Sequence, residues 1–537
     1  MITLYDTTLR DGTQGEGISL TVEDKLRVTE MLDGFGIHLV EGGWPGSNPK
    51  DEEYFERVRK LRLNHARIAA FGSTCRPSLT PDKDDNLRLL LGAQTPVATI
   101  FGKSWTRHVT QVLRTDLDNN LRLVEQSVAF LKKAGREVIF DAEHFFDGYL
   151  DHPDYALSVL RAAVNGGADT VVLCDTNGGM LPWQIEQAVT RVRETLSAPL
   201  GIHAHNDSGC AVANSMTAVR AGCTHVQGTM NGLGERCGNA DLCPIIANLE
   251  LKTGSPVLPE GNLARLTEVS RFIAEVANIS HPANLPYVGR SAFAHKAGVH
   301  VSALQRDEGS YEHCRPDQVG NQTRVLVSEL SGRGNIKHKA GEFGLDADGN
   351  DDAHIELLTR IKELENQGFA FEAAEASVEL IMRRGKPDYR PFFELIDFLV
   401  VVEHRKGRGH LAEANVKIRI GEKEYHTASD GVGPVGALDG AMRKALMDVY
   451  PAIDRFRLVD YKVRILDSDH ATQALTRVMI DTSDGKVTWT TVGASRNIIE
   501  ASWQALYDSF EYGLLRVSNR KEAPAKKTKT SVGARPG

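Results

Sequence analysis

The first 250 residues alternate short β-prone runs with longer helical stretches, and this alternation constrains the fold more than any other feature. The segments between the runs place apolar residues at helical spacing, as in 22–32 and 121–131. Eight β–α repeats over this length predict a closed parallel TIM (β/α)8 barrel in the α/β class, with a doubly wound open sheet as the alternative. The expected strands are 2–5, 38–42, 67–72, 97–101, 137–142, 169–174, 199–204 and 224–229.

Polar side chains gather at the carboxyl ends of these expected strands. Barrels of this kind carry their catalytic groups at that end, so these positions are candidate site residues. They are Arg10 and Asp11 after the first strand, Glu143 at the end of the fifth, Thr176 at the end of the sixth, His203 and His205 at the end of the seventh, and Asn239 after the eighth.

The segment 203–207, His-Ala-His-Asn-Asp, follows an apolar run and is expected to end a buried strand. Residues two apart share one face of a strand, so His203 and His205 point the same way. Two imidazoles on one face can bind a metal ion. The alternative is that one or both are hydrogen-bonded core histidines, but the expected nearby carboxylate of Asp11 favours metal.

Length, charge and cysteine usage point to a cytoplasmic enzyme. A chain of 537 residues is too long for a single core. Its net charge of −8 argues against nucleic-acid binding, because proteins that bind nucleic acids usually have a basic face. Seven cysteines without a Cys-x-x-Cys pair indicate reduced thiols. No secretory signal or membrane-spanning run is expected, because charged residues interrupt the apolar stretches.

Composition divides the chain into a catalytic barrel over 1–280, a helical linker or lid region over 281–394, a C-terminal domain over 395–517 and a disordered tail over 518–537. Within the linker, 332–352 is rich in Gly, Asp and Asn and is expected to be loop, while 353–384 is expected to form helices broken around Gly368.

The C-terminal domain is expected to be α+β, with strands over 395–402, 412–420, 458–467 and 474–482. Two glycine-led helices, from Gly431 and from Gly493, lie about 60 residues apart and suggest an internal duplication.

Three motifs together resemble the metal-dependent aldolase-type barrels that condense acetyl-CoA with a 2-oxo acid, a family that includes 2-isopropylmalate, homocitrate and citramalate synthases. The resemblance extends from residue 2 to about residue 515. The segments 15–19 and 41–48 look most like the citramalate synthase branch. The motifs are Asp6-Thr-Thr-Leu-Arg-Asp-Gly12, His203-Ala-His-Asn-Asp207 and Gly232-Leu-Gly-Glu-Arg-Cys-Gly-Asn239.

The resemblance implies an acyltransferase acting on acetyl-CoA and pyruvate, with a divalent Mg, Mn or Zn ion polarising the keto group. Asp11, His203, His205 and Asn239 would be the metal ligands. Arg10 would stabilise the developing alkoxide and contact the substrate. Thr176 would hydrogen-bond the oxo-acid carboxylate. The segment Ala297-Gly-Val-His300 matches the family's lid, so His300 would be the base, helped by Tyr311, with Glu143 as a further catalytic group.

Each assignment has a structural alternative. Arg10 could pair with Asp11 or Glu143 for stability alone, and Glu143 could orient a ligand. Thr176 could cap a strand end, and Asn239 could occupy a left-handed turn. His300, far away in sequence, could be a structural histidine.

Three classes of function remain open on this sequence: a condensing acyltransferase, a lyase or carboxyltransferase on a similar barrel, and a non-catalytic amino-acid sensor. Within the first class, the rivals of citramalate synthesis are 2-isopropylmalate and homocitrate synthesis. The C-terminal domain resembles the allosteric domain of 2-isopropylmalate synthases, which implies a homodimer and an amino-acid effector, isoleucine for a citramalate synthase. The alternative is a plain dimerisation domain.

Overall fold

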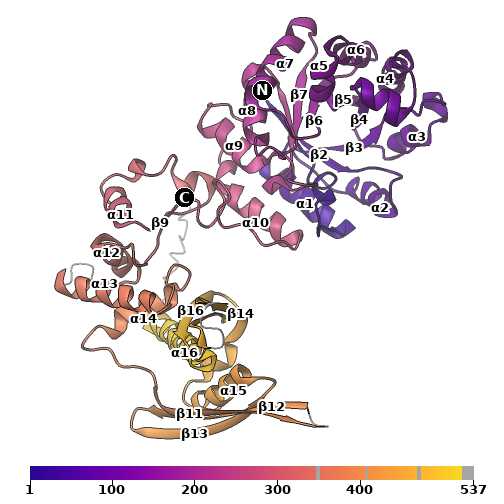
Figure 1. Ribbon diagram of the computed structural model, residues 1–537. Coiled ribbons are helices and arrows are strands. Elements are labelled where there is room, and N and C mark those ends of the chain that lie inside the picture. The colour runs from indigo at the N-terminus through magenta and orange to yellow at the C-terminus, as the bar shows by residue number, and fades with distance from the viewer. Residues whose placement is uncertain (346–350, 407–408, 468–472, 523–537) are drawn as a thin grey trace, which may run out of the picture. The chain divides into compact units, whose positions relative to one another are not determined.

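The computed structural model describes residues 1–345, 351–406, 409–467 and 473–522 (Figure 1). The chain forms two compact units. One comprises residues 1–293 and 312–323, and the other comprises residues 294–311 and the chain from residue 324 onward.

The first unit is built on a closed barrel of parallel strands, in which β8 pairs back onto β1 with Thr3 opposite His225. This closure confirms the TIM barrel and excludes the open sheet. Every expected strand is present within two residues of its expected ends. The strands are β1 (Thr3–Asp6), β2 (Leu39–Gly43), β3 (Arg67–Ser73), β4 (Val97–Lys103), β5 (Glu137–Glu143), β6 (Thr170–Asp175), β7 (Leu200–Ala204) and β8 (His225–Gly228).

Helices surround the barrel strands, as the indigo to magenta part of Figure 1 shows. Several begin at a side chain that accepts a backbone N–H, as Thr21 does from Asp24 and Asn48 does from Asp51. These helices are α1 (Val22–Phe35), α2 (Pro49–Val58), α3 (Asp85–Gly92), α4 (Leu117–Lys133), α5 (Phe145–Asp151), α6 (Pro153–Asn165), α7 (Pro182–Thr195), α8 (Ala211–Ala221), α9 (Leu242–Leu251) and α10 (Leu266–Val276).

The barrel interior is a packed core. A buried cluster within it consists of Tyr5, Leu39, Ala69, Val97, Ile139, Val172 and Cys174. Strands of a barrel alternate inward and outward side chains, and this layer leaves the polar residues at the carboxyl ends of the strands above it. The core therefore supports a site at one end of the barrel.

The second unit begins with short helices and strands that include α11 (Gly298–Leu304), α12 (Arg333–Glu342), α13 (Asp351–Asn366) and α14 (Glu375–Arg384). The helices α13 and α14 confirm the expected helical region on both sides of Gly368. The expectation of a loop over 332–352 is wrong, because α12 lies within it; residues 346–350 lie outside the described residues. The side chain of Asn335 accepts from Gly332 N and donates to two backbone carbonyls, so this asparagine anchors a helix instead of a turn.

The rest of the second unit repeats one topology twice: three antiparallel strands followed by a helix. This repetition agrees with the suspected duplication. The sequence pattern missed β13 and β16. The elements are β11 (Glu394–Arg405), β12 (Gly409–Ile420), β13 (Lys423–Gly431) and α15 (Pro434–Met447), then β14 (Arg457–Ile465), β15 (Thr476–Ser483), β16 (Thr488–Ser495) and α16 (Ile498–Glu522).

The two glycines expected to start helices belong to strands instead. Gly431 ends β13 and Gly493 lies in β16, while the helices begin at Pro434 and Ile498. A Cβ at Gly431 would lie 2.4 Å from Ala437 N, and one at Gly493 would lie 2.1 Å from Ala501 O. The glycines are needed because each helix packs directly against its strand.

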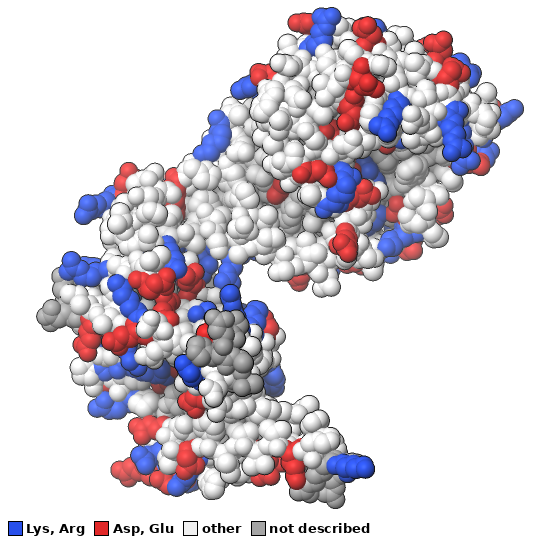
Figure 2. Space-filling model, in the orientation of Figure 1, with Lys and Arg blue, Asp and Glu red and all other residues white. Residues whose placement is uncertain are grey.

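The expected tail from residue 518 begins too early, because α16 runs to Glu522; residues 523–537 lie outside the described residues. All seven cysteines are free thiols. In the described part of the chain, no helix has the length and apolar character to cross a membrane. On the face seen in Figure 2, basic and acidic side chains are interspersed over both units.

Candidate active site

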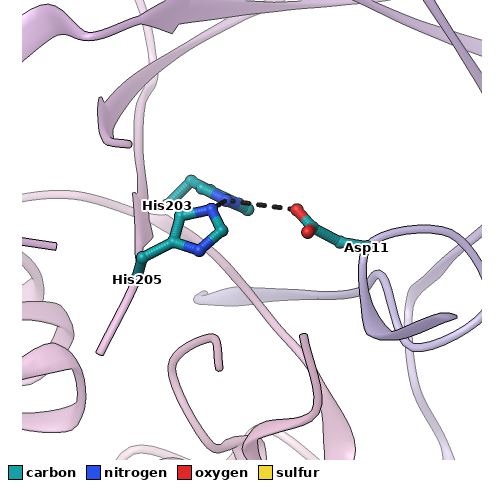
Figure 3. A group of neighbouring side chains, drawn as sticks. All are labelled: Asp11, His203 and His205. Carbon is teal, nitrogen blue, oxygen red and sulfur yellow. Dashed lines mark hydrogen bonds and ion pairs between the residues drawn. The ribbon is translucent and has the colours of Figure 1, made fainter. Parts of the chain in front are cut away.

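Asp11 meets two histidines that lie far from it in sequence, His203 and His205, at the carboxyl end of the barrel (Figure 3). His203 is on β7 and His205 lies just beyond it, and their Nε2 atoms are 3.2 Å apart. Asp11 follows β1, and its Oδ2 lies 3.5 Å from His203 Nε2. All three are buried. The expected shared direction of the two imidazoles is therefore present, with the carboxylate of Asp11 beside them.

The polar atoms of this group fit a divalent cation. Within the described residues, Asp11 Oδ1, His205 Nδ1 and Asn239 Oδ1 are buried without a hydrogen-bond partner. Leaving a buried polar atom unpaired costs about 1–3 kcal/mol, and a cation held by this group would satisfy the oxygens of Asp11 and Asn239. Carboxylate and amide oxygens together with imidazole nitrogens form a donor set suited to Mg, Mn or Zn.

A glutamine fixes which nitrogen of His203 faces this group. Gln227 Nε2 donates to Asp141 Oδ1 at 3.0 Å, which leaves its Oε1 to accept from His203 Nδ1–H, also at 3.0 Å. The lone pair of His203 Nε2 is then directed at His205 and Asp11. Metal-binding histidines are oriented by hydrogen bonds of this type.

The protonation states also suit cation binding. Burial acts to raise the pKa of Asp11, but Arg10 and the two imidazoles lower it to about 2. Burial lowers the pKa of His205 to about 4, with His203 adding to the shift, and burial lowers the pKa of His203 as well. At neutral pH the group therefore holds one carboxylate and two neutral imidazoles, which are the forms that bind metals.

Arg10 lies beside this group and is held from three sides. Its NH1 is 3.1 Å from Asp11 Oδ2, its Nε pairs with Glu41, and its guanidinium carbon lies 3.7 Å from the centre of the Phe71 ring. Burial acts to lower the pKa of Arg10, and the carboxylates of Glu41 and Asp11 outweigh it and raise the pKa. The expected pairing with Asp11 is present, whereas Glu143 pairs with Lys103.

A pocket of about 250 Å³ opens onto these side chains. Arg10, Asp11, Glu143, Thr176, His203 and His205 all line it. The hydroxyl of Thr176 accepts from His144 N at 2.8 Å, which leaves its own hydrogen free to be donated. The structure thus brings six of the seven candidate barrel residues to one cavity.

Asn239 is the seventh, and it lies at the end of the glycine-rich loop, opposite His205 in a short β-bridge. Its Nδ2 donates to Leu233 O at 3.0 Å. A Cβ at Gly234, where φ is +155°, would lie 2.2 Å from Asn239 Nδ2. The loop needs glycine at this position so that the backbone can pass beside the Asn239 amide.

His300 and Tyr311 belong to the second unit. Their rings are stacked, with centroids 4.2 Å apart. The structure brings these two candidates to each other, His300 from α11 and Tyr311 from the segment that follows it.

Sequence reasoning missed several residues that line this cavity or hold the side chains that do. Glu41 is in β2 near its carboxyl end, so the rule that identified Glu143 could have found it. Gln227 and Asp141 are inward-facing polar residues on β8 and β5, and the alternation of strand side chains was the signal available for them. Trp44, Phe71 and Phe101 come from three different segments, and no local pattern predicts that they meet.

Three family models cover most of the chain. The model described as HMGL-like matches residues 1–273. The model described as homocitrate synthase post-HMGL domain-like matches residues 287–368. The model described as LeuA allosteric (dimerisation) domain matches residues 372–514.

Curated relatives match over nearly the whole chain. The (R)-citramalate synthase of Geobacter sulfurreducens is 53% identical over 96% of this chain and 98% of its own length. The (R)-citramalate synthase of Aquifex aeolicus is 51% identical over the same shares. A probable 2-isopropylmalate synthase of Methanopyrus kandleri is 31% identical over 97% of this chain and 99% of its own length. The chain belongs to the (R)-citramalate synthase family.

Proposed function

We propose that this protein condenses acetyl-CoA with pyruvate and hydrolyses the thioester, giving (R)-citramalate and free CoA. In this reaction, the methyl carbon of acetyl-CoA forms a bond to the keto carbon of pyruvate, and water releases the CoA thiol. The observation that supports it most is the buried group of Asp11, His203 and His205 beside Arg10 in one small pocket. The identity of more than half to the citramalate synthases adds the substrate class.

Asp11, His203, His205 and Asn239 would hold the divalent ion. Such an ion supplies Lewis acidity, which makes a keto carbon more electrophilic. These four residues present neutral nitrogens and anionic or amide oxygens from a buried, preformed arrangement. Gln227 orients His203 within it.

Arg10 would supply positive charge where the keto oxygen becomes an alkoxide. Glu41 and Asp11 fix its guanidinium, so no reorganisation is needed during the reaction. Thr176 would donate its hydroxyl hydrogen to the pyruvate carboxylate, since its oxygen already accepts from His144 N. Glu143, held by Lys103, would act at the pocket edge.

We assign removal of the methyl proton of acetyl-CoA to His300. The phenol ring of Tyr311 is stacked on its imidazole and would orient it. Tyr311 is 46% exposed and His300 is half-buried, so the imidazole is not sealed off from an incoming thioester.

An aromatic wall favours pyruvate over larger 2-oxo acids. Trp44 meets Phe71 and Phe101 edge-on at 5.7 Å, and the two phenyl rings stack at 5.5 Å. These rings line the pocket, and the Phe71 ring lies against the guanidinium of Arg10, 3.7 Å from its central carbon. A rigid wall of this kind suits a methyl substituent, because each added methylene needs space that close-packed rings do not yield.

Thiol release tests the proposed function. The purified protein is assayed with acetyl-CoA, a divalent ion and one of three acids: pyruvate, 2-oxoisovalerate or 2-oxoglutarate. We expect turnover with pyruvate and at most a small fraction of that rate with the others. A preference for 2-oxoisovalerate would identify a 2-isopropylmalate synthase instead, and thiol release without any oxo acid would indicate simple hydrolysis.

We further infer that the C-terminal domain joins two copies of the chain and binds an amino-acid effector, isoleucine. The support is the match of residues 372–514 to an allosteric and dimerisation domain. Exposed apolar side chains on strands of this domain, among them Leu399 and Val459, suit contact with a second copy.

A further inference from the structure

The aromatic wall that Trp44 forms with Phe71 and Phe101, called the Trp44 wall below, adjoins the turn at the end of β2. A buried ion pair between two helices lies behind this turn. Lys25 on α1 and Asp51 on α2 pair at 2.5 Å, with side chains only 4% and 9% exposed. Neither residue lines the pocket. Burial acts to lower the pKa of Lys25, and Asp51 opposes this shift. Placing two charges out of water is costly, so a pair in this position needs a reason beyond general stability.

The remaining hydrogen bonds of this pair go to the turn at the end of β2. Lys25 Nζ donates to Gly42 O at 3.0 Å, and Asp51 Oδ2 accepts from Trp44 N at 2.9 Å. The pairing of β2 with β3 is irregular at this turn, between Glu41 and Gly43. Irregular strand ends of this type re-aim side chains next to active sites.

The turn has no freedom to move toward the helices. At Gly43, where φ is +150°, a Cβ would lie 2.5 Å from the Asp51 carboxylate. At Gly42, a Cβ would lie 2.1 Å from the Tyr54 ring. The turn therefore rests directly on the ion pair and on Tyr54.

The residues on either side of the turn contact side chains that line the pocket. Glu41 precedes it and pairs with Arg10. Trp44 follows it, packs against Phe71 and Phe101, and donates from Nε1 to Asn86 at 2.8 Å. A displacement of the turn would move the indole first, because its backbone N–H is the group that Asp51 holds.

We propose that the Lys25–Asp51 pair is a positioning device that fixes the Trp44 wall and so sets the size of 2-oxo acid that the pocket accepts. This inference rests on the proposed condensation of acetyl-CoA with pyruvate. A simple tether between α1 and α2 would not need bonds to Gly42 and Trp44. An exposed pair, Arg57 with Glu23, already joins the same two helices.

The test compares kcat/KM for pyruvate with kcat/KM for 2-oxobutyrate, which is longer by one methylene. The ratio of the two values does not depend on the fraction of active protein, so a loss of folded material alone would not move it. Lys25→Met with Asp51→Ala removes both charges and both bonds to the turn. We expect the ratio of kcat/KM for pyruvate to kcat/KM for 2-oxobutyrate to fall about tenfold in this variant. This is the lower end of the discrimination that one methylene gives in a close-fitting pocket.

A graded variant and a matched control accompany it. Lys25→Met with Asp51→Asn keeps an oxygen acceptor for Trp44 N–H, and its ratio should fall by only about threefold. Glu23→Gln with Arg57→Met removes the exposed pair between the same helices and should leave the ratio at the wild-type value. Thermal unfolding of each variant checks that it is folded.

The inference is wrong if the Ala variant keeps the wild-type ratio, or if the control shifts the ratio equally. If the Ala variant does not fold, the Asn variant decides: a lowered ratio supports the inference and an unchanged one overturns it. A wild-type protein that turns over neither acid would instead refute the proposed condensation, so the two failures are distinguishable.

Discussion

At the scale of single residues, His203 meets both descriptions that its sequence context left open. Its Nδ1 is hydrogen-bonded within the core, to Gln227, as in a structural histidine. Its Nε2 faces His205 and Asp11, as in a ligand. The two roles are complementary, because the bond to Gln227 leaves the lone pair of Nε2 available.

Substitution of the histidines tests the metal site. We expect His203→Ala and His205→Ala to abolish thiol release while the proteins stay folded. Chelation of the wild type should also abolish activity, and a divalent ion should restore it. Because a ligand that binds only the folded state stabilises it, the ion at about 100 times its Kd should add roughly 2.7 kcal/mol to the wild type and much less to the variants. Full turnover in metal-free buffer would contradict the site.

Arg10→Lys tests transition-state stabilisation. Lysine keeps the charge but loses the planar fork that contacts Asp11 and Glu41 together. We expect kcat to fall on the order of 10²-fold, with a smaller change in KM. Steady-state kinetics with pyruvate as the varied substrate measure both. An unchanged kcat with a raised KM would make Arg10 a ground-state binder.

The sequence could locate the candidate site residues because barrels carry their catalytic and binding residues at the carboxyl ends of the strands. Arg10, Asp11 and His203 follow that rule. It could not reveal Gln227 as the orienting group, since a glutamine on a strand has many ordinary explanations. Nor could it reveal Trp44 with Phe71 and Phe101, because their meeting depends on the whole closed barrel and not on any local pattern.

At the scale of elements, the barrel strands were predictable because parallel strands are buried on both faces and so form continuous apolar runs. The missed strand β13 is mostly exposed and half-buried, without such a run. The missed helix α12 begins in a Gly-rich and Asn-rich segment whose Asn335 acts through long-range bonds. In both cases tertiary contacts outweigh the local composition.

His225 on β8 makes barrel stability depend on pH. It is buried against Tyr5, with ring centroids 5.3 Å apart, and burial lowers its pKa to about 3. Between about pH 6.5 and about pH 3, His225 is therefore protonated in the unfolded chain and neutral in the folded barrel. This difference should cost up to roughly 5 kcal/mol of unfolding free energy, at about 1.4 kcal/mol per pH unit.

Denaturant unfolding between pH 7 and pH 4 measures the slope. His225→Gln removes the titrating group, so its unfolding free energy should fall less steeply with decreasing pH than that of the wild type. Because other buried histidines also titrate, the comparison is between the two slopes and not with zero. Identical slopes would show that His225 is not the group responsible.

At the scale of the whole molecule, exposed apolar strands in the C-terminal domain predict where two copies meet. Leu399 on β11 and Val459 on β14 are 59% and 56% exposed. Leu399→Asp with Val459→Asp should convert a dimer to a monomer, since it places charges in an apolar contact. Light scattering measures the mass. Leu150→Asp, at an equally exposed leucine on α5 of the barrel, is the control and should leave the dimer intact.

Regulation is the last expectation at this scale. In the two repeats of the C-terminal domain, α15 begins after a turn that follows Gly431, and α16 begins after a turn that follows β16. The start of a helix offers N–H groups to a carboxylate. We expect isoleucine to inhibit the full-length enzyme and leucine to have little effect. Inhibition requires the effector to prefer one of two states, and a coupling of roughly 1–3 kcal/mol would shift the apparent affinity by about 5-fold to 150-fold.

Titration of both amino acids against the full-length and truncated proteins measures this coupling. Deleting the chain from about residue 395 should remove sensitivity to isoleucine, and activity should fall as well if the domain holds the dimer together. The dimer-breaking variant separates these effects, because it keeps the effector site but loses the contact between copies. Inhibition by leucine instead of isoleucine would favour 2-isopropylmalate synthesis. If neither amino acid binds the full-length protein, the C-terminal domain serves dimerisation alone.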